Sequence, residues 1–384
     1  MIHNNPLIYQ KMSEHIPLAI QSEIMNRLPV KSLLQFRSIC KPWKYLIESS
    51  DFIAHYSSQQ QHLLVTYLHL DDNRQEYVSF VDDDDDSFPQ HRVSVTLPPF
   101  FKMLKYHVII GSSHGLICLW GVYSPGVSAV IWNPSIRKAV YAVVPYMTYE
   151  EQYRSALGFG VCRKTTDAKI VIITRPQSSI IDMKSVDPWL VEVFTLSTRA
   201  WRSPYSGNFP SKSIKYIEFP VVVDRLAHRD SITVDDGKFT TYRLIISFDM
   251  TSEEFGEVNL PDRLAHGHYR TSMYQLRESL VVIESGYEAD KRVYHVWMMV
   301  DAVPKSFQKL YTMSSHSPDA SLINVRGFRK TGQPLIELRA HPGDDIRILA
   351  AYEPHSKSIS NLGINGRIFV YCYLYSCMET LLLL

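Results

Sequence analysis

A short pattern that recurs along the last two thirds of the chain constrains its fold more than any other feature of the sequence. In each regular copy a strand-like run ends in an aromatic residue, a turn follows, and a residue that begins the next strand stands seven positions after the aromatic. A looser fifth copy, with a longer turn, runs from Trp297 to Phe307. The four regular copies are Trp132 with Ala139, Phe194 with Trp201, Phe248 with Phe255, and Tyr352 with Ile359.

The spacing of these copies indicates a β-propeller. Their aromatic residues are separated by 62, 54, 49 and 55 residues. Repeats of short strands with a period near ~50 residues are typical of kelch-like propeller blades. Such repeats bury their faces only against their neighbours, so they stabilise one another as a set. We therefore predict an all-β, kelch-like propeller, with a β-sandwich of coincidental spacing as the alternative. Five hairpins are visible, and Leu63–Phe80 is a candidate for a sixth.

The residues before position 60 follow a helical periodicity instead. Apolar residues recur at Ile20, Ile24 and Leu28 and again within Leu33–Ile39, and Pro42 suits the first turn of a third helix. Three short helices in so small a segment cannot enclose a good core alone. Such a unit usually buries its remaining apolar face against a partner or against the rest of the chain.

Composition and charge exclude several classes of function. Lys and Arg total 40 against 39 for Asp and Glu, so a net charge of +1 gives no global attraction to nucleic acid or to an anionic membrane. The 5 cysteines are scattered without a CxxC motif, which favours a reducing compartment. The N-terminus lacks the features of a signal peptide, and no apolar stretch approaches the ~20 residues of a membrane span. We expect a soluble protein of the cytoplasm, the nucleus or both, without nucleic-acid or membrane partners.

Motifs that carry bond chemistry are missing from the sequence. There is no phosphate-binding GxxxxGK[ST], no GxSxG and no HExxH, and Gly158-Phe159-Gly160 lacks the third glycine of a dinucleotide fingerprint. His266 and His268 lack the further ligands that a zinc site needs, so a loop or edge-strand pair is favoured. We therefore expect no catalytic residues, no metal and no cofactor.

Charged and thiol clusters also have simple structural interpretations. The acidic run Asp82–Asp86 lacks the alternating ligands and turn glycine of a calcium loop, which favours a solvated loop over a calcium site. The basic pair Arg329-Lys330 follows a strand near a turn, where solvated charge is expected. Cys372 and Cys377 lie in an apolar, aromatic stretch and are predicted to be buried thiols.

The helical segment resembles the F-box, in its plant version. The resemblance is carried by Ile16-Pro17, Glu23-Ile24, Arg27–Leu34, and Phe36–Lys41 with Trp43. The remainder is similar to the type-one F-box-associated domain of a large plant family, in Gly111-Ser112, Gly115–Leu119, Trp132–Lys138, Ile246–Asp249 and Glu254-Phe255. The resemblance implies an α+β multidomain chain. Its expected parts are a disordered N-terminus (1–12), a three-helix F-box (13–57) and a β-propeller-like domain (58–384).

The resemblance also implies a function. F-box proteins of this kind are non-catalytic substrate-recognition subunits of SCF-type (Skp–cullin–F-box) E3 ubiquitin ligases. The F-box would dock on a Skp-type adaptor, and through it on cullin and RING subunits, while the β domain captures a target protein that the sequence does not identify. A binding or scaffold module without ligase assembly is the alternative. An enzyme on a kelch-like propeller is a third hypothesis, which no residue of the sequence singles out.

The residues expected at the adaptor contact are aliphatic side chains and prolines of the helical segment. This composition suits the centre of a protein interface, where buried aliphatics outnumber charges. We expect Phe36, Ile39, Trp43 and Leu46 to form the internal core of the unit instead, and Leu34 is a candidate for either role. No substrate-binding residues are assigned. The expected adaptor-contact residues are Ile16, Pro17, Ile20, Ile24, Leu28, Pro29, Leu33 and Leu34.

Overall fold

The computed structural model describes most of the chain, with gaps between strands. The described residues are 16–56, 61–69, 75–82, 88, 92–99, 101, 104, 107–123, 126–144, 155–174, 190–204, 226–235, 238–267, 269–288, 291–300, 306–314, 321–339, 341, 346–367 and 374–383. The predicted disordered segment 1–12 lies outside them, as do Asp83–Asp86, His268 and Cys372.

Four short helices begin the described chain: α2 (Leu18–Met25), α3 (Val30–Phe36), α4 (Lys41–Ile47) and α5 (Ser50–His55). Pro17 and Pro29 directly precede α2 and α3, and Pro42 lies in the first turn of α4, where the missing N–H is tolerated. The predicted three helices are present. A fourth, α5, follows because the Ser49 hydroxyl accepts a hydrogen bond from the Phe52 N–H (3.2 Å) and caps its first turn.

The remainder is almost entirely β-structure. The described strands form five hydrogen-bonded sheets, and every pairing is antiparallel. Three sheets have four strands each. The first consists of β4 (His107–Ser113), β5 (Leu116–Tyr123), β6 (Gly126–Asn133) and β7 (Lys138–Val143), and the second of β8 (Ser155–Val161), β9 (Ala168–Thr174), β10 (Leu190–Thr195) and β11 (Ala200–Arg202). The third consists of β15 (Arg270–Leu276), β16 (Ser279–Glu288), β17 (Lys291–Val300) and β18 (Ser306–Ser314). One sheet has three strands, β12 (Leu226–Asp235), β13 (Lys238–Phe248) and β14 (Phe255–Asn259), and a single helical turn, α6 (Asp262–Ala265), follows it.

The fifth sheet has eight strands and consists of two blade-sized groups. One group is β19 (Ser321–Phe328), β20 (Pro334–Arg339), β21 (Ile346–Tyr352) and β22 (Ile359–Arg367). The other joins both ends of the β region: β1 (Gln61–Leu68), β2 (Gln75–Val81), β3 (Arg92–Ser94) and the last strand, β23 (Leu374–Met378), which pairs with β1. Strand pairing between the two groups consists of one described residue pair, Leu68 with Arg367. The predicted strands within Leu63–Phe80 are thus present as β1 and β2.

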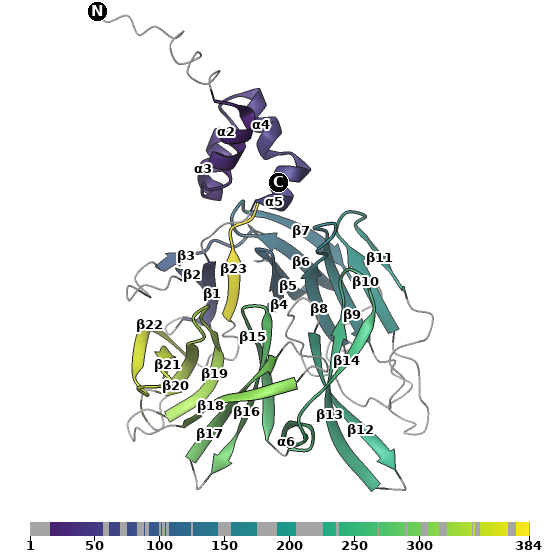
Figure 1. Ribbon diagram of the computed structural model, residues 1–384, viewed down its shortest axis with the longest axis vertical. Helices are drawn as coiled ribbons and strands as arrows, with labels where there is room; N and C mark the ends of the chain where they lie inside the picture. The colour runs from purple at the N-terminus through teal and green to yellow at the C-terminus, as the bar shows by residue number, and fades with distance from the viewer. Residues whose placement is uncertain are drawn as a thin grey trace, which may run out of the picture.

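The groups of strands follow one another around a ring, with the helices at one side of it (Figure 1). Apolar clusters lie between successive groups. Leu116 of β5 and Ile170 of β9, for example, belong to one cluster, and Phe248 of β13 and Val193 of β10 belong to the next. Further clusters join the remaining neighbours, including β1 and β2 to both β20–β22 and β4–β6. The all-β domain is therefore a β-propeller, as the repeat spacing predicted.

The recurring sequence pattern corresponds to one kind of hairpin. In all four regular copies the aromatic residue and the residue seven positions later are direct cross-strand partners. Two of these pairs are in ring contact, Phe194 with Trp201 (5.3 Å between centroids) and Phe248 with Phe255 (5.0 Å). The looser copy differs, because its strands continue beyond Trp297 before the longer turn: Trp297 pairs with Lys309, and Phe307 pairs with Met299.

The interpretation of Asp82 and Arg329 as solvated charges is wrong. The Asp82 side chain is 1% exposed and accepts hydrogen bonds from Arg329 Nε (3.0 Å) and from the Lys330 backbone N–H (2.7 Å). Arg329 is itself buried. This ion pair connects the end of β2 to the turn after β19, so it joins the two groups of the eight-stranded sheet.

Candidate functional site

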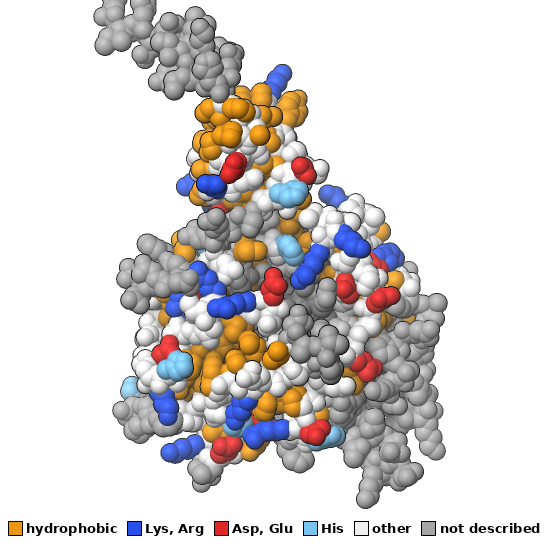
Figure 2. Space-filling view, viewed as in Figure 1, with side chains coloured by type: hydrophobic (Ala, Val, Ile, Leu, Met, Phe, Trp, Pro, Cys, Tyr) orange, Lys and Arg blue, Asp and Glu red, His pale blue; other side chains and the backbone are white. Residues whose placement is uncertain are grey.

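The clearest concentration of exposed apolar side chains lies on and just before α2. Ile16, Leu18, Ile20 and Ile24, the α2 apolar face, are each between 43% and 55% exposed. Ile16, Ile20 and Ile24 stand four residues apart, a spacing that puts side chains on one side of a helix. Figure 2 shows hydrophobic side chains gathered over this helical end of the molecule. Nothing in the described part of the chain covers this face, and an exposed apolar face of this kind is typical of a binding surface.

The face is free because other residues fill the core of the helical unit (16–56). Of the predicted adaptor-contact residues, Ile16, Pro17, Ile20, Ile24 and Pro29 are exposed. Leu28 and Leu34 are half-buried and pack against the core, and Leu33 is fully buried within it. The structure therefore separates the eight residues into an exposed group and a group that holds the helices together. The core residues are Met25, Val30, Leu33, Ile47, Phe52, Tyr56 and Leu381.

The predicted internal core residues are placed as expected with one exception. Phe36, Trp43 and Leu46 pack against the core of the helical unit, and the Phe36 and Trp43 rings are in contact, with 5.3 Å between centroids. Ile39 is wrongly predicted, since its side chain is 62% exposed. The reason is local: α3 ends at Phe36, and Ile39 lies in the turn that precedes α4, outside the helical periodicity.

The exposure of the Leu18 and Tyr45 side chains was not predicted from the sequence. Leu18 is two residues from Ile20, so it falls outside the spacing of three or four residues that identified the other members of the face. Tyr45 lies between Trp43 and Leu46, whose apolar character indicated an inward-facing segment of α4. Its exposure could not be read from composition, because Tyr is common both inside and outside a fold.

Polar contacts orient the helices that carry the face. Trp43 Nε1 donates a hydrogen bond to Gln21 Oε1 (2.6 Å) and thereby joins α4 to α2. The Tyr56 hydroxyl donates to the Leu28 carbonyl (2.8 Å), which ties the end of α5 to the turn after α2. Burial, with a smaller contribution from the charge of Glu379, raises the pKa of Tyr56, so its hydroxyl stays protonated and remains a donor.

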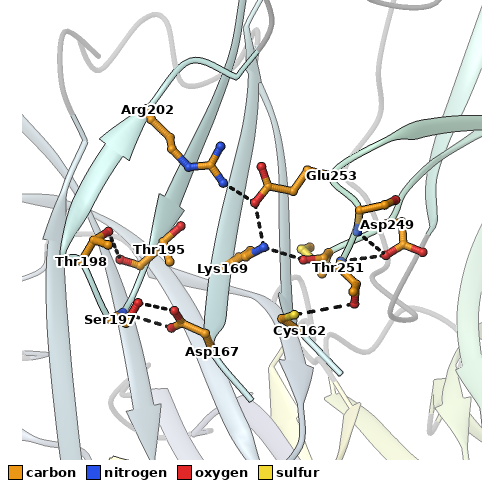
Figure 3. A network of polar contacts seen from close by, with 12 residues as sticks. Cys162, Asp167, Lys169, Thr195, Ser197, Thr198, Arg202, Asp249, Thr251 and Glu253 are labelled. Carbon is orange, nitrogen blue, oxygen red and sulfur yellow. Dashed lines mark hydrogen bonds and ion pairs between the residues drawn. The ribbon is translucent and has the colours of Figure 1, made fainter. Parts of the chain in front are cut away.

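A polar network of the propeller connects two neighbouring sheets (Figure 3). The buried Lys169 of β9 donates through Nζ to the Met250 carbonyl and to Glu253 Oε1, both at 2.7 Å, and Arg202 also pairs with Glu253. Burial raises the pKa of Glu253, but the hydrogen bonds and charges of Arg202 and Lys169 outweigh it and hold this pKa below its usual value. Each charge has its partner, so the network joins sheets rather than offering a reactive group.

Local hydrogen bonds surround the thiol of Cys162 in the same region. Although burial alone would raise it, hydrogen bonds from Thr165, Thr251 and Lys164 lower the pKa of Cys162 to about 7. The side chain is buried, and its Sγ lies 3.7 Å from Thr251 Oγ1. Within the described residues no group of three or more His, Cys, Asp or Glu side chains is placed to hold a metal ion. Cys377 is buried, as predicted.

No described helix is both long enough and apolar enough to cross a membrane.

Comparisons with known proteins follow the same division of the chain. Residues 14–55 match the model of the F-box domain, and residues 78–329 match the model of the F-box associated beta propeller domain. F-box protein At5g10340 of Arabidopsis thaliana is 27% identical over 79% of this chain and 70% of its own length. F-box/kelch-repeat protein At3g23880 of the same plant is 24% identical over 84% of this chain and 82% of its own length.

Likeness to solved structures is weaker. TolB from Acinetobacter baumannii is 9% identical, with a TM-score of 0.41 over 82% of this chain and 66% of that chain. A TM-score of this size supports no inference about function.

Proposed function

This chain belongs to the family of F-box proteins with an F-box associated beta propeller domain, and we propose that it is the substrate-recognition subunit of an SCF-type E3 ubiquitin ligase. In this role the helical unit docks on a Skp-type adaptor, and the adaptor links the chain to cullin and RING subunits. The propeller captures a target protein. The chain would act in the cytoplasm, the nucleus or both.

The observation that carries this proposal is the exposure of the α2 apolar face on a unit whose core is already complete. Ile16, Leu18, Ile20 and Ile24 contribute nothing to that core, so their aliphatic character is explained by contact with a partner. The four residues include no charged group, which suits the desolvated centre of an interface. Pro17 and Pro29, which directly precede α2 and α3, are exposed as well.

The contribution of such a subunit is proximity, since it performs no bond chemistry of its own. Holding a target and a ubiquitin-carrying enzyme on one assembly converts an encounter between free proteins into one at high effective concentration. The polar networks of the described propeller residues are consistent with this role, because they pair charges between sheets rather than present them as acids or bases.

The test is co-purification with a plant Skp-type adaptor, comparing the wild-type chain with Ile20→Asp plus Ile24→Asp. Both positions are solvent-exposed in the free chain, so the substitutions leave its core intact. A carboxylate buried at an apolar interface costs about 2 kcal/mol or more, so the pair should weaken the complex at least about 100-fold. Leu33 is unsuitable for this test because it is fully buried, and its replacement would unfold the helices.

The matched control is Val143→Asp plus Leu190→Asp, which places two carboxylates at exposed apolar positions of the propeller. We expect this variant to bind the adaptor like the wild type. A wild-type chain that is folded but does not bind, or a helical variant that binds as well as the control, contradicts the proposal. A stable adaptor complex that recruits no cullin supports the scaffold alternative instead.

A further inference from the structure

The end of the chain crosses from the propeller into the helical unit. After β23 pairs with β1, the chain continues upward and ends beside α5 (Figure 1). Leu381 is fully buried and belongs to the apolar cluster of the helical unit, against which Ile136 of the β6–β7 turn also packs. The helical unit is therefore completed by a side chain that lies more than three hundred residues later in the sequence.

Polar contacts hold the same segment on both sides. Toward the helices, Glu379 Oε2 accepts a hydrogen bond from the Val30 backbone N–H (3.0 Å), in the first turn of α3. Toward the propeller, Asn133 Nδ2 donates to the carbonyl of Thr380 (2.9 Å) and to that of Leu382 (2.6 Å). Asn133 is itself fully buried at the end of β6, so these two carbonyls occupy a fixed place.

Packing on the propeller side requires a glycine. Gly115, in the turn between β4 and β5, has a φ of +79°, and a Cβ added to it would lie 2.3 Å from the Met378 carbonyl oxygen and 2.7 Å from Thr380 Cγ2. Leu382 and Leu383 pack against the apolar cluster of β4–β10, whereas Leu381 points the other way. Consecutive leucines thus enter two different cores.

We infer that residues 379–383, the C-terminal clasp, are a structural part of the F-box and fix it on the propeller. Neither family match reaches the clasp, since the F-box match ends at residue 55 and the propeller match at residue 329. The clasp closes the core behind α3, α4 and α5, and it limits rotation of the helical unit on the linker between α5 and β1. The orientation of the α2 apolar face relative to the propeller is set by this contact.

One consequence of the clasp rests on the proposed function. If the helical unit binds a Skp-type adaptor, that binding depends on an intact C-terminus, because loosening the core displaces the helices that carry the interface. A ligase subunit also benefits from a fixed joint, since the distance between bound target and ubiquitin-carrying enzyme then stays constant.

The test is amide hydrogen exchange of the full chain in the absence of any partner, for the wild type, Leu381→Ala, Leu381→Met and Leu382→Ala. Leu381→Ala leaves a cavity in the helical core, and exchange within residues 30–56 should become at least about tenfold faster. Leu381→Met keeps the volume, so it should retain protection to within about threefold. Leu382→Ala removes the adjacent leucine from the propeller side and should likewise leave residues 30–56 protected.

Exchange in residues 30–56 that is unchanged in Leu381→Ala overturns the inference, as does equal acceleration in Leu381→Ala and Leu382→Ala. Adaptor affinity is then measured for the same chains, and Leu381→Ala should bind at least about tenfold more weakly than the wild type. A wild-type chain that binds no adaptor, together with the expected exchange pattern, refutes the proposed function and leaves the clasp in place. Equal affinity despite faster exchange refutes the dependence of binding on the clasp.

Discussion

At the scale of single residues, several hairpin turns of the propeller contain a residue in the left-handed backbone region, which their sequences do not predict. Arg137, Arg199, Glu253 and Lys357 each stand five positions after the aromatic of a regular copy, and each has a φ between 51° and 60°. Thr166 has a φ of 54° in the equivalent turn between β8 and β9, where Val161 pairs with Ala168. Left-handed residues are usually glycine or asparagine, so these five give no sequence signal of the conformation they adopt.

Lys357 offers a direct test of this conformation, because its side chain is exposed. A Cβ in the left-handed region costs about 1–2 kcal/mol. Lys357→Gly removes this strain from the folded chain, but it also makes the unfolded chain more flexible, which offsets part of the gain in stability. We expect Lys357→Gly to raise the free energy of unfolding by up to about 1 kcal/mol and Lys357→Val, which is β-branched, to lower it by about 1 kcal/mol. Urea unfolding measures both.

The control is Ser356→Gly in the same turn, a position without a positive φ. There glycine adds flexibility to the unfolded chain and removes the hydrogen bonds between the Ser356 hydroxyl and Ser358, so it should reduce stability by about 0.5–1 kcal/mol. A gain at residue 356 equal to that at residue 357 would show that the turn prefers glycine for reasons other than its left-handed backbone.

At the scale of elements, neighbouring groups of strands are joined by buried ion pairs as well as by apolar clusters. Asp82 and Arg329 join β2 to the turn after β19, and Glu253 with Lys169 and Arg202 joins the sheets of β8–β11 and β12–β14. In each case the partners come from distant parts of the sequence. Local patterns around Asp82 indicated a solvated loop because four further acids follow it, and nothing nearby reveals the arginine that faces it.

Removing one partner of the Asp82–Arg329 pair should be costly. Asp82→Ala leaves a buried guanidinium without its carboxylate, and such a loss typically destabilises a protein by about 3–5 kcal/mol. The exposed pair Arg27–Glu23, one helical turn apart on α2, supplies the comparison, and Glu23→Ala should change stability by less than about 0.5 kcal/mol. Thermal unfolding of both variants checks the difference. A similar small effect for Asp82→Ala would mean that water replaces the carboxylate around Arg329.

At the scale of the whole molecule, the parts that the sequence predicted are those set by local pairing. The hairpins were predictable because an aromatic residue and its partner seven positions later meet across one turn. The exposed Ile20 and Ile24 were predictable because helical spacing groups them. The burial of Leu33 was not, since the core around it is completed by Leu381 from the other end of the chain. Periodicity reports which side chains share a face, but it does not report which distant segment covers that face.

Three histidines in different sheets, His295 buried and His62 and His107 half-buried, make the stability of the whole molecule depend on pH. Burial lowers the pKa of His62, His107 and His295 below the ordinary value of 6.5, and for His295 the charges of Lys309 and Arg263 act in the same direction. The unfolded chain therefore binds more protons than the folded chain between the folded-state pKa values and 6.5. The contribution of these histidines to the free energy of unfolding is fully present above pH 6.5 and is lost as the pH falls through this window. Glu253, with its lowered pKa, loses its contribution only below 4.5.

We therefore expect the free energy of unfolding to fall between pH 7 and pH 5, before the carboxylates titrate. Urea unfolding across this range measures the slope. His62→Gln removes one of the three groups and should make the slope shallower, because burial lowers the pKa of His62 by more than the charge of Glu379 raises it. A stability that stays constant from pH 7 to pH 5 would mean that these histidines gain water or a counter-charge on protonation, and that the sheets open enough to admit it.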